Sequence, residues 1–242
     1  MRRVRVLAIV HQPDAGPGVF ADAIRDVGSR LDSWHLPQSA EPPEDPLGYD
    51  AVMTFGGAVH PTQLEEHSWL AREKEVLGEL LDRRVPLLGV CLGSELVAEA
   101  AGAQLRRAPS PEIGWYEVET TDEAARDPLL APLAPAFRAL EWHSYETSLP
   151  PGAVPLARSA GCLQAFRVDQ SAWGIQFHAE VTPADFEAWL DDYRSDPDAV
   201  AAGLDPERLR SQTRAAIADW NRLGRELCRR FLAVAAPSSK VC

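Results

Sequence analysis

The chain has 242 residues, of which 45% are hydrophobic, and it carries 36 Asp and Glu against 24 Lys and Arg. A chain of this length and composition can bury a full core, and one domain is favoured over two. The formal net charge of -12 disfavours non-specific binding to nucleic acid or to an anionic membrane surface, because both require clustered positive charge.

The N-terminal apolar run ends at Val10 and is too short for a signal peptide or a membrane span. We therefore expect a cytoplasmic protein with no membrane partner. The four cysteines, Cys91, Cys162, Cys228 and Cys242, are widely scattered and lack CxxC spacing. Neither a disulfide framework nor a zinc site is favoured, so no metal and no cofactor is predicted.

Predicted strands and helices alternate along the first hundred residues. In chain order they are a strand at 4–10, a helix at 18–31, a strand at 51–55, an amphipathic helix at 65–82, a strand at 84–90 and a helix at 94–103. This order implies a parallel sheet with helices on both faces and with loops gathered at the carboxyl ends of the strands.

Short strands are predicted to dominate residues 115–176, which makes the sheet mixed. We therefore predict an α/β fold with an open mixed, mostly parallel sheet flanked by helices. Behind the helix start at Asp205 and Pro206, apolar residues recur at helical spacing from Leu209 to Phe231. We expect a main domain at residues 1–183 and a C-terminal helical extension at 184–242 that packs on it. A homodimer or partner interface is the alternative use of this apolar stripe.

The segment from Leu88 to Glu95 reads LGVCLGSE and places Cys91 where a buried strand turns into a helix. This is the geometry of a nucleophile elbow, in which Gly89 and Gly93 leave room for the sharp turn. The positive end of the helix dipole lowers the pKa of a thiol placed there and so favours the reactive thiolate. A buried cysteine before a helix can also be inert packing, so a nucleophile here requires a base.

A candidate base lies in the segment AWGIQFHAE at residues 172–180, which resembles a strand running into a loop. Residues two apart share a face of an extended chain, so Glu180 can orient the imidazole of His178. A histidine at a strand end can also be only a satisfied polar group. Together the two segments predict a triad of Cys91, His178 and Glu180.

These residues resemble the class I glutamine amidotransferase family, which uses a Cys-His-Glu triad. The resemblance covers nearly all of residues 4–183. Besides the two segments above, it includes FGG at 55–57, EIGW at 112–115, WHS at 142–144, LP at 149–150 and QAF at 164–166. Within the family the chain is most similar to free-standing, GMP-synthase-like amidotransferases, and the resemblance implies a flavodoxin-like catalytic domain at residues 1–183.

The resemblance implies hydrolysis of the glutamine side-chain amide through a γ-glutamyl thioester on Cys91, with release of ammonia. His178 would protonate the leaving amine and then activate water. The positions that match the family's oxyanion donors are the backbone N–H groups of Leu92 and Gly57. A diglycine at residues 56–57 can also be only a tight turn.

The resemblance further implies that the backbone of Ser144 and Tyr145 holds the amino and carboxylate groups of the substrate. Two departures from the family pattern lie beside the catalytic segments, where Ala58 and Ala179 replace the usual prolines. These replacements reduce loop rigidity but remove no chemical group.

A third departure changes a charge, because Glu95 stands where most members have a substrate-binding glutamine. Its carboxylate either stabilises the first turn of the helix or points into the pocket. In the pocket it would raise the pKa of Cys91 and repel the α-carboxylate of free glutamine.

Three functions follow from this sequence. The first is a glutaminase whose ammonia passes to an acceptor synthetase or transferase on another chain, since the sequence contains no G-x-x-x-x-G-K-[ST] phosphate loop and no second domain of synthetase size. The second is a stand-alone hydrolase of γ-glutamyl peptides or amines. The third is a non-catalytic regulatory or binding subunit, which Glu95 favours and the triad disfavours.

Overall fold

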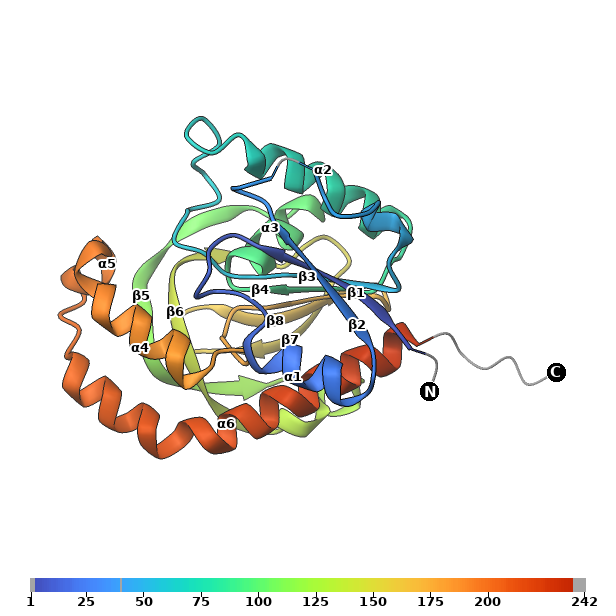
Figure 1. Ribbon diagram of the computed structural model, residues 1–242. Coiled ribbons are helices and arrows are strands. Elements are labelled where there is room, and N and C mark those ends of the chain that lie inside the picture. Colours follow the sequence, from blue (N-terminus) through green and yellow to red (C-terminus); the bar gives the residue numbers. More distant parts are fainter. Residues whose placement is uncertain (1–2, 40, 237–242) are drawn as a thin grey trace.

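A computed structural model of the chain describes residues 3–39 and 41–236 (Figure 1). Within these residues, nine strands form one sheet in the order β2-β1-β3-β4-β9-β8-β7-β5-β6. The strands are β1 Arg5–Val10, β2 Arg30–His35, β3 Ala51–Thr54, β4 Leu87–Val90, β5 Leu105–Thr120, β6 Ala136–Thr147, β7 Val154–Arg158, β8 Leu163–Val168 and β9 Ala172–Ile175. Neighbours are parallel from β2 to β9 and antiparallel from β9 to β6. The predicted α/β fold with an open mixed sheet is confirmed.

Helices cover both faces of the parallel half of the sheet (Figure 1). Strand β1, which lies next to the edge strand β2, is almost wholly apolar, and its side chains alternate between two hydrophobic clusters. One cluster includes α1 (Gly18–Asp26) and α6 (Pro206–Ala235), and the other includes α2 (Trp69–Asp82) and α3 (Leu92–Ala100). A strand that is apolar on both faces must be covered on both, which explains the helix pattern.

After β9, the C-terminal segment forms α4 (Pro183–Asp192), the short 3-10 turn η4 (Tyr193–Ser195) and α5 (Pro197–Ala201), and α6 follows. Asp205 caps α6 by accepting from the backbone N–H of Arg208. The apolar stripe of α6 packs on the sheet, and Phe231 is fully buried in the same cluster as α1. The division into domains at residue 183 stays a prediction. Further 3-10 turns are η1 (Pro46–Gly48), η2 (Ala124–Arg126) and η3 (Ala131–Leu133).

Several predicted boundaries are wrong. The helix expected at 18–31 ends at Asp26, because Gly28 has a positive φ of 69° and the chain then enters β2. The helices expected at 65–82 and 94–103 begin at Trp69 and Leu92, and the strand expected at 84–90 begins only at Leu87. The strands expected to be short include β5 and β6, which have 16 and 12 residues.

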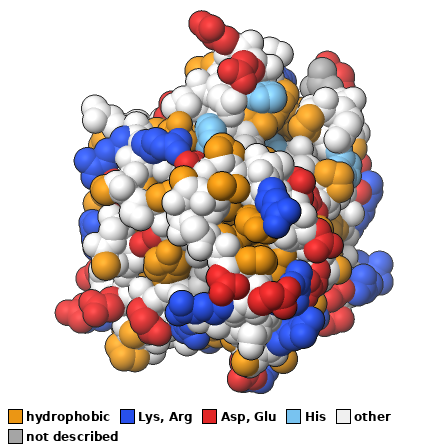
Figure 2. Space-filling view, turned by 90° about the vertical axis from the view of Figure 1, so that its left-hand side faces the viewer, with side chains coloured by type: hydrophobic (Ala, Val, Ile, Leu, Met, Phe, Trp, Pro, Cys, Tyr) orange, Lys and Arg blue, Asp and Glu red, His pale blue; other side chains and the backbone are white. Residues whose placement is uncertain are grey.

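No helix among the described residues is long and apolar enough to cross a membrane. Figure 2 shows Lys and Arg side chains interspersed with Asp and Glu on one face of the molecule, with histidine side chains in the upper part of the view. The charge on this face is therefore mixed in sign.

At Gly224, α6 packs closely against the loop after β9. A Cβ at Gly224 would lie 2.0 Å from the carbonyl oxygen of Ala179, whereas a Cβ at Gly78 in α2 meets nothing within 4 Å. We expect Gly224→Ala to lower the free energy of unfolding by about 1–3 kcal/mol through overpacking. The matched control Gly78→Ala should raise it by up to about 1 kcal/mol through helix propensity. Urea unfolding followed by tryptophan fluorescence measures both, and equal stabilisation by the two changes would contradict the packing.

Candidate active site

Cys91 lies on the turn between β4 and α3 with backbone angles of φ 51° and ψ -115°. A non-glycine residue in this region costs on the order of 1–3 kcal/mol, and such strain is typical of functional sites. The two flanking glycines allow the turn. A Cβ at Gly89 would lie 2.5 Å from the carbonyl oxygen of Gly93, and a Cβ at Gly93 would lie 2.2 Å from that of Thr54.

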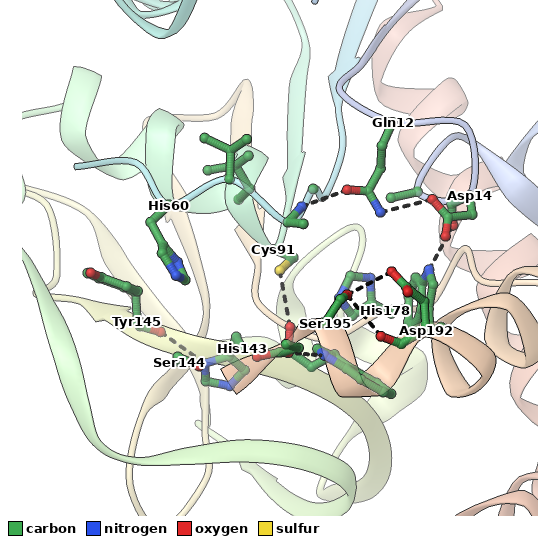
Figure 3. Close-up of a pocket in the computed structure, with 18 of the residues that line it drawn as sticks. Gln12, Asp14, His60, Cys91, His143, Ser144, Tyr145, His178, Asp192 and Ser195 are labelled. Carbon is green, nitrogen blue, oxygen red and sulfur yellow. Dashed lines mark hydrogen bonds between the residues drawn. The ribbon is translucent and has the colours of Figure 1, made fainter. Parts of the chain in front are cut away.

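His178 follows β9 and lies next to the thiol, within hydrogen-bonding reach of Cys91. Its Nδ1 is 2.8 Å from Oε1 of Glu180, and both side chains are almost fully buried. The edge of the His178 ring packs against Trp189 at 4.8 Å between ring centroids. The thiol also donates to the carbonyl oxygen of Trp142 at 3.6 Å (Figure 3). The structure therefore brings the three predicted triad residues together.

The charges of the triad depend on each other. Burial raises the pKa of the Cys91 thiol, while the neighbouring His178 acts to lower it. Burial alone would lower the pKa of His178, but Glu180 and Cys91 together raise it well above its usual range. A thiolate at position 91 is therefore stabilised chiefly by protonated His178, which Glu180 holds in place.

The diglycine loop after β3 lies directly against the triad. A Cβ at Gly56 would be 3.1 Å from Cε1 of His178, and a Cβ at Gly57 would be 3.3 Å from Cδ2 of Leu92. No side chain therefore fits at either position without displacing a neighbour. The N–H of Leu92 belongs to the first turn of α3, where backbone N–H groups have no partner within the helix.

A buried ion pair supports this loop from behind. Nδ1 of His11 is 3.1 Å from the carbonyl oxygen of Gly56, and its Nε2 is 2.8 Å from Glu73. Thr54 donates to the other oxygen of Glu73 at 2.6 Å. Although burial acts to lower the pKa of His11, Glu73 raises it overall, so both ring nitrogens are favoured as donors. This pair has no local sequence signal and was not predicted, because 62 positions separate its members.

Cys91 opens into a cavity of about 220 Å³ (Figure 3). This volume suits a small polar ligand, since sites for drug-sized molecules are usually roughly 300–1,000 Å³. All predicted site residues except Glu180 line it, and Glu180 lies behind His178. The segment from α4 to α5 also lines the cavity, which the sequence did not predict. Its lining residues are Trp189, Asp192, Tyr193, Ser195, Asp196 and Pro197.

The cavity lining is acidic. Asp14, Glu95, Asp192 and Asp196 contribute carboxylates, and no Lys or Arg is found among the described residues that line it. Asp196 also accepts from the indole N–H of Trp142 at 2.9 Å, which ties the C-terminal segment to β6. A ligand carrying an amine would therefore be favoured here over one that presents only negative charge.

Ser144 and Tyr145 line the cavity from β6, on the side of Cys91 opposite Gln12 and Asp14 (Figure 3). The ring of Tyr145 lies 4.8 Å from that of His60 between centroids. This placement is compatible with the predicted backbone contacts to substrate, which stay a prediction.

Glu95 lies in the first turn of α3 and also lines the cavity. The two positions expected for its carboxylate, at the helix start and in the pocket, are therefore one and the same. Its Oε1 accepts from Nε2 of Gln176 at 3.1 Å. Burial raises the pKa of Glu95 from an ordinary 4.5 to about 7. Below pH 7 the group is therefore mostly neutral and similar in shape and charge to a glutamine side chain.

Comparisons with known proteins agree with the fold and with the family that the sequence resembles. The sequence model of the family described as glutamine amidotransferase class-I matches residues 18–192. The glutamine amidotransferase-like protein YfeJ of Salmonella typhimurium is 30% identical over 184 residues, which cover 74% of this chain and 77% of YfeJ. One subunit of the glutamine-hydrolyzing GMP synthase of Sulfurisphaera tokodaii is 34% identical over 146 residues, which cover 57% of this chain and 73% of that protein. A solved glutamine amidotransferase from Thermotoga maritima has a TM-score of 0.86 at 27% identity and covers 96% of this chain and 99% of its own.

Thiol reactivity tests the coupling within the triad. We expect Cys91 to be alkylated by iodoacetamide faster than Cys162 or Cys228. Burial raises the pKa of both of these thiols, and neighbouring carboxylates raise that of Cys162 further, whereas His178 acts to lower the pKa of Cys91. His178→Ala should slow alkylation of Cys91 about 10-fold or more, since the thiolate loses its counter-ion. Peptide mass spectrometry gives the rate at each cysteine, and an unchanged rate at Cys91 in His178→Ala would contradict the coupling.

The raised pKa of Glu95 predicts a pH-dependent stability. Folded Glu95 holds its proton up to about pH 7, while the unfolded chain releases it near pH 4.5. The free energy of unfolding of the wild type should therefore fall between these values, by up to ~3 kcal/mol relative to Glu95→Gln. Urea unfolding at pH 5 and pH 8 measures the difference, with Glu79→Gln on the exposed face of α2 as the control. If the free energies of unfolding of wild type and Glu95→Gln differ by the same amount at both pH values, Glu95 is not a buried neutral carboxyl.

Proposed function

Because the chain belongs to the class I glutamine amidotransferase family, we propose that it hydrolyses the side-chain amide of glutamine and releases ammonia. The observation that carries this proposal is that Cys91, on a strained turn that opens into a small cavity, lies beside buried His178, which in turn contacts Glu180. A nucleophile beside a base, which a carboxylate in turn orients, is the arrangement that acyl transfer requires.

In the proposed reaction the Cys91 thiolate attacks the carbonyl carbon of the amide, and the carbonyl electrons move to the oxygen. His178 donates its proton to the leaving nitrogen, so the C–N bond breaks, ammonia leaves and a γ-glutamyl thioester remains on Cys91. Neutral His178 then takes a proton from water, and the hydroxide attacks the thioester. Collapse of the second tetrahedral intermediate releases glutamate and restores the thiolate beside protonated His178. Glu180 keeps the imidazole in one orientation throughout.

The oxyanion of both tetrahedral intermediates requires donors, which we assign to the N–H groups of Leu92 and Gly57. The peptide between Gly56 and Gly57 is oriented by His11, which contacts its carbonyl oxygen. The C=O and N–H of a trans peptide point in opposite directions, so this contact directs the N–H of Gly57 away from His11. Loss of one oxyanion donor typically costs about 2.7–4 kcal/mol of transition-state stabilisation.

This assignment predicts an effect of a residue that lies behind the diglycine loop. We expect His11→Phe to lower kcat on the order of 10- to 100-fold with little change in KM, because the donor acts mainly in the transition state. His11→Asn, which can still donate to the carbonyl oxygen of Gly56, should retain more activity. Steady-state kinetics of both variants test this, and equal losses in the two, or a loss confined to KM, would argue against an orienting role.

The ammonia acceptor is proposed to lie on another chain. The relatives from Sulfurisphaera tokodaii and Ignicoccus hospitalis are each named as one subunit of a GMP synthase, and a separate synthetase or transferase chain would use the ammonia released here. A glutaminase of this kind is slow alone and accelerates when its acceptor completes the site.

A second candidate is the hydrolysis of a γ-glutamyl amine, and the acidic cavity lining favours it. With four carboxylates and no Lys or Arg among its described lining residues, the cavity is suited to a substrate that carries a second amine. Above pH 7 the ionised Glu95 would also repel the α-carboxylate of free glutamine. The reaction at Cys91 is the same, with an amine in place of ammonia as the leaving group.

The test is the release of ammonia from glutamine and of free amine from γ-glutamyl derivatives of a monoamine and of a diamine. Release by the wild type that is lost in Cys91→Ser is the expected result, and the substrate with the higher kcat/KM separates the two candidates. If glutamine is the substrate, Glu95→Gln should raise kcat/KM at pH 8 several-fold and change it little at pH 6. No release from any substrate by the wild type, with or without a synthetase chain, would leave only the non-catalytic alternative.

A further inference from the structure

A second group of ionisable side chains lies buried outside the triad, between β5, β6 and the turn before β8. A carboxylate oxygen of Glu112, an imidazole nitrogen of His143 and Sγ of Cys162 lie within 4.8 Å of one another, and all three residues are buried. Local spacing does not reveal this group, because its members come from three separate segments of the chain.

The hydrogen bonds of His143 leave one ring nitrogen in an unusual position. Nδ1 lies 2.9 Å from the carbonyl oxygen of Tyr145, which can only accept, so Nδ1 carries a proton. Nε2 faces carboxylate oxygens of Glu112 at 3.1 Å and Glu141 at 3.4 Å. In neutral His143 the lone pair of Nε2 would point at two further acceptors, so this contact requires a proton or a metal cation between them.

Glu141 supplies an independent observation. Its side chain is fully buried, and apart from the 3.4 Å ion-pair contact of Oε2 with His143 neither of its oxygens has a hydrogen-bond partner among the described residues. Buried carboxylates are normally paired, because an unpartnered one costs several kcal/mol. The amide oxygen of Gln164 is also buried and unpartnered, while its nitrogen donates to Glu112 at 2.7 Å. Arg106 pairs with Glu146 at 2.9 Å, and its side chain is mostly exposed.

We propose that Glu112, His143 and Cys162 bind a zinc ion, with Glu141, which contacts His143, as the fourth ligand. Sulfur, imidazole nitrogen and carboxylate oxygen form a donor set that suits zinc, and four protein ligands without an open position are typical of a structural site. Burial and Glu112 raise the pKa of the Cys162 thiol to about 12, so the sulfur keeps its proton until a metal ion displaces it.

The zinc ion would join β5 and β6 to the turn at residues 159–162. Ser159 donates to Glu112 at 2.7 Å, and a Cβ at Gly161 would lie 3.4 Å from the same carboxylate, so this turn covers the site. Ala160 and Gly161 are exposed, which gives an ion a short path from solvent. Because His143 lines the cavity together with the two residues that follow it, the ion would also fix the part of β6 that carries Ser144 and Tyr145.

The experiment uses the full chain with Cys91→Ala, because Cys91 and His178 could also hold a metal ion. The protein is treated with a chelator and dialysed, zinc is added, and bound zinc is measured by elemental analysis and by titration against a chromophoric chelator. We expect one zinc ion per chain. Cys162→Ser in this background should weaken binding at least about 10-fold, whereas Cys228→Ser, which replaces a buried cysteine on α6 outside the group, should leave it unchanged.

Cobalt provides a readout that requires no change to the ligands and therefore no assumption about the folding of variants. Cobalt added to the Cys91→Ala protein should give a sulfur-to-metal charge-transfer band in the near ultraviolet and the intense visible bands of tetrahedral cobalt. Absence of stoichiometric zinc, or zinc binding that Cys162→Ser does not weaken and that gives no such band, would overturn the proposal. Neither result bears on the glutaminase proposal, which the unmodified protein tests separately.

Discussion

The catalytic geometry depends on how the loop after β9 is held. Its backbone forms four hydrogen bonds with residues of β6, α1 and α6. The N–H of His178 donates to the carbonyl oxygen of Leu140 in β6, and its carbonyl oxygen accepts from Trp220 in α6. The carbonyl oxygen of Glu180 accepts from the N–H of Val19 in α1, and that of Val181 accepts from Asn221 in α6. The proposed base and its carboxylate are thus fixed by residues from both ends of the chain, and α6 is part of the support of the active site.

Burial strengthens the contacts between histidine and glutamate side chains around the active site. Three buried histidines around the cavity each contact a glutamate: His178 contacts Glu180, His11 contacts Glu73, and His143 contacts Glu112. In a low-dielectric interior such contacts are stronger than in water, and an unpartnered member is costly. The first contact stabilises the thiolate and the second orients the diglycine loop. The third lies beneath the strand that lines the cavity, and there the excess of carboxylates favours a cation.

The sequence predicts the parts of this site that local chemistry encodes. The glycines around Cys91 indicate the elbow because no Cβ fits there, and the two-residue spacing of His178 and Glu180 places both side chains on one face. The alternating apolar segments likewise predict the parallel sheet and its two helical layers.

Long-range contacts could not be predicted in the same way. The pairing of His11 with Glu73, the wall formed by residues 189–197 and the group around His143 each join segments far apart in the chain, and none carries a local pattern. The edge strand β2 is missed because its residues are mostly polar and half exposed. The orientation of Glu95 also required the structure, since a carboxylate in a first helical turn can point to solvent or into a cavity.

In the proposed function, glutamine binds with its side-chain amide against the Cys91 thiol. The most direct measurement is the rate at which a chloroketone analogue of glutamine labels the protein, with the labelled residue located by peptide mass spectrometry. We expect labelling of Cys91 at one group per chain, slowed by added glutamine in a saturable manner. Labelling that spreads over other cysteines, or that glutamine does not slow at any concentration at pH 6, would contradict it.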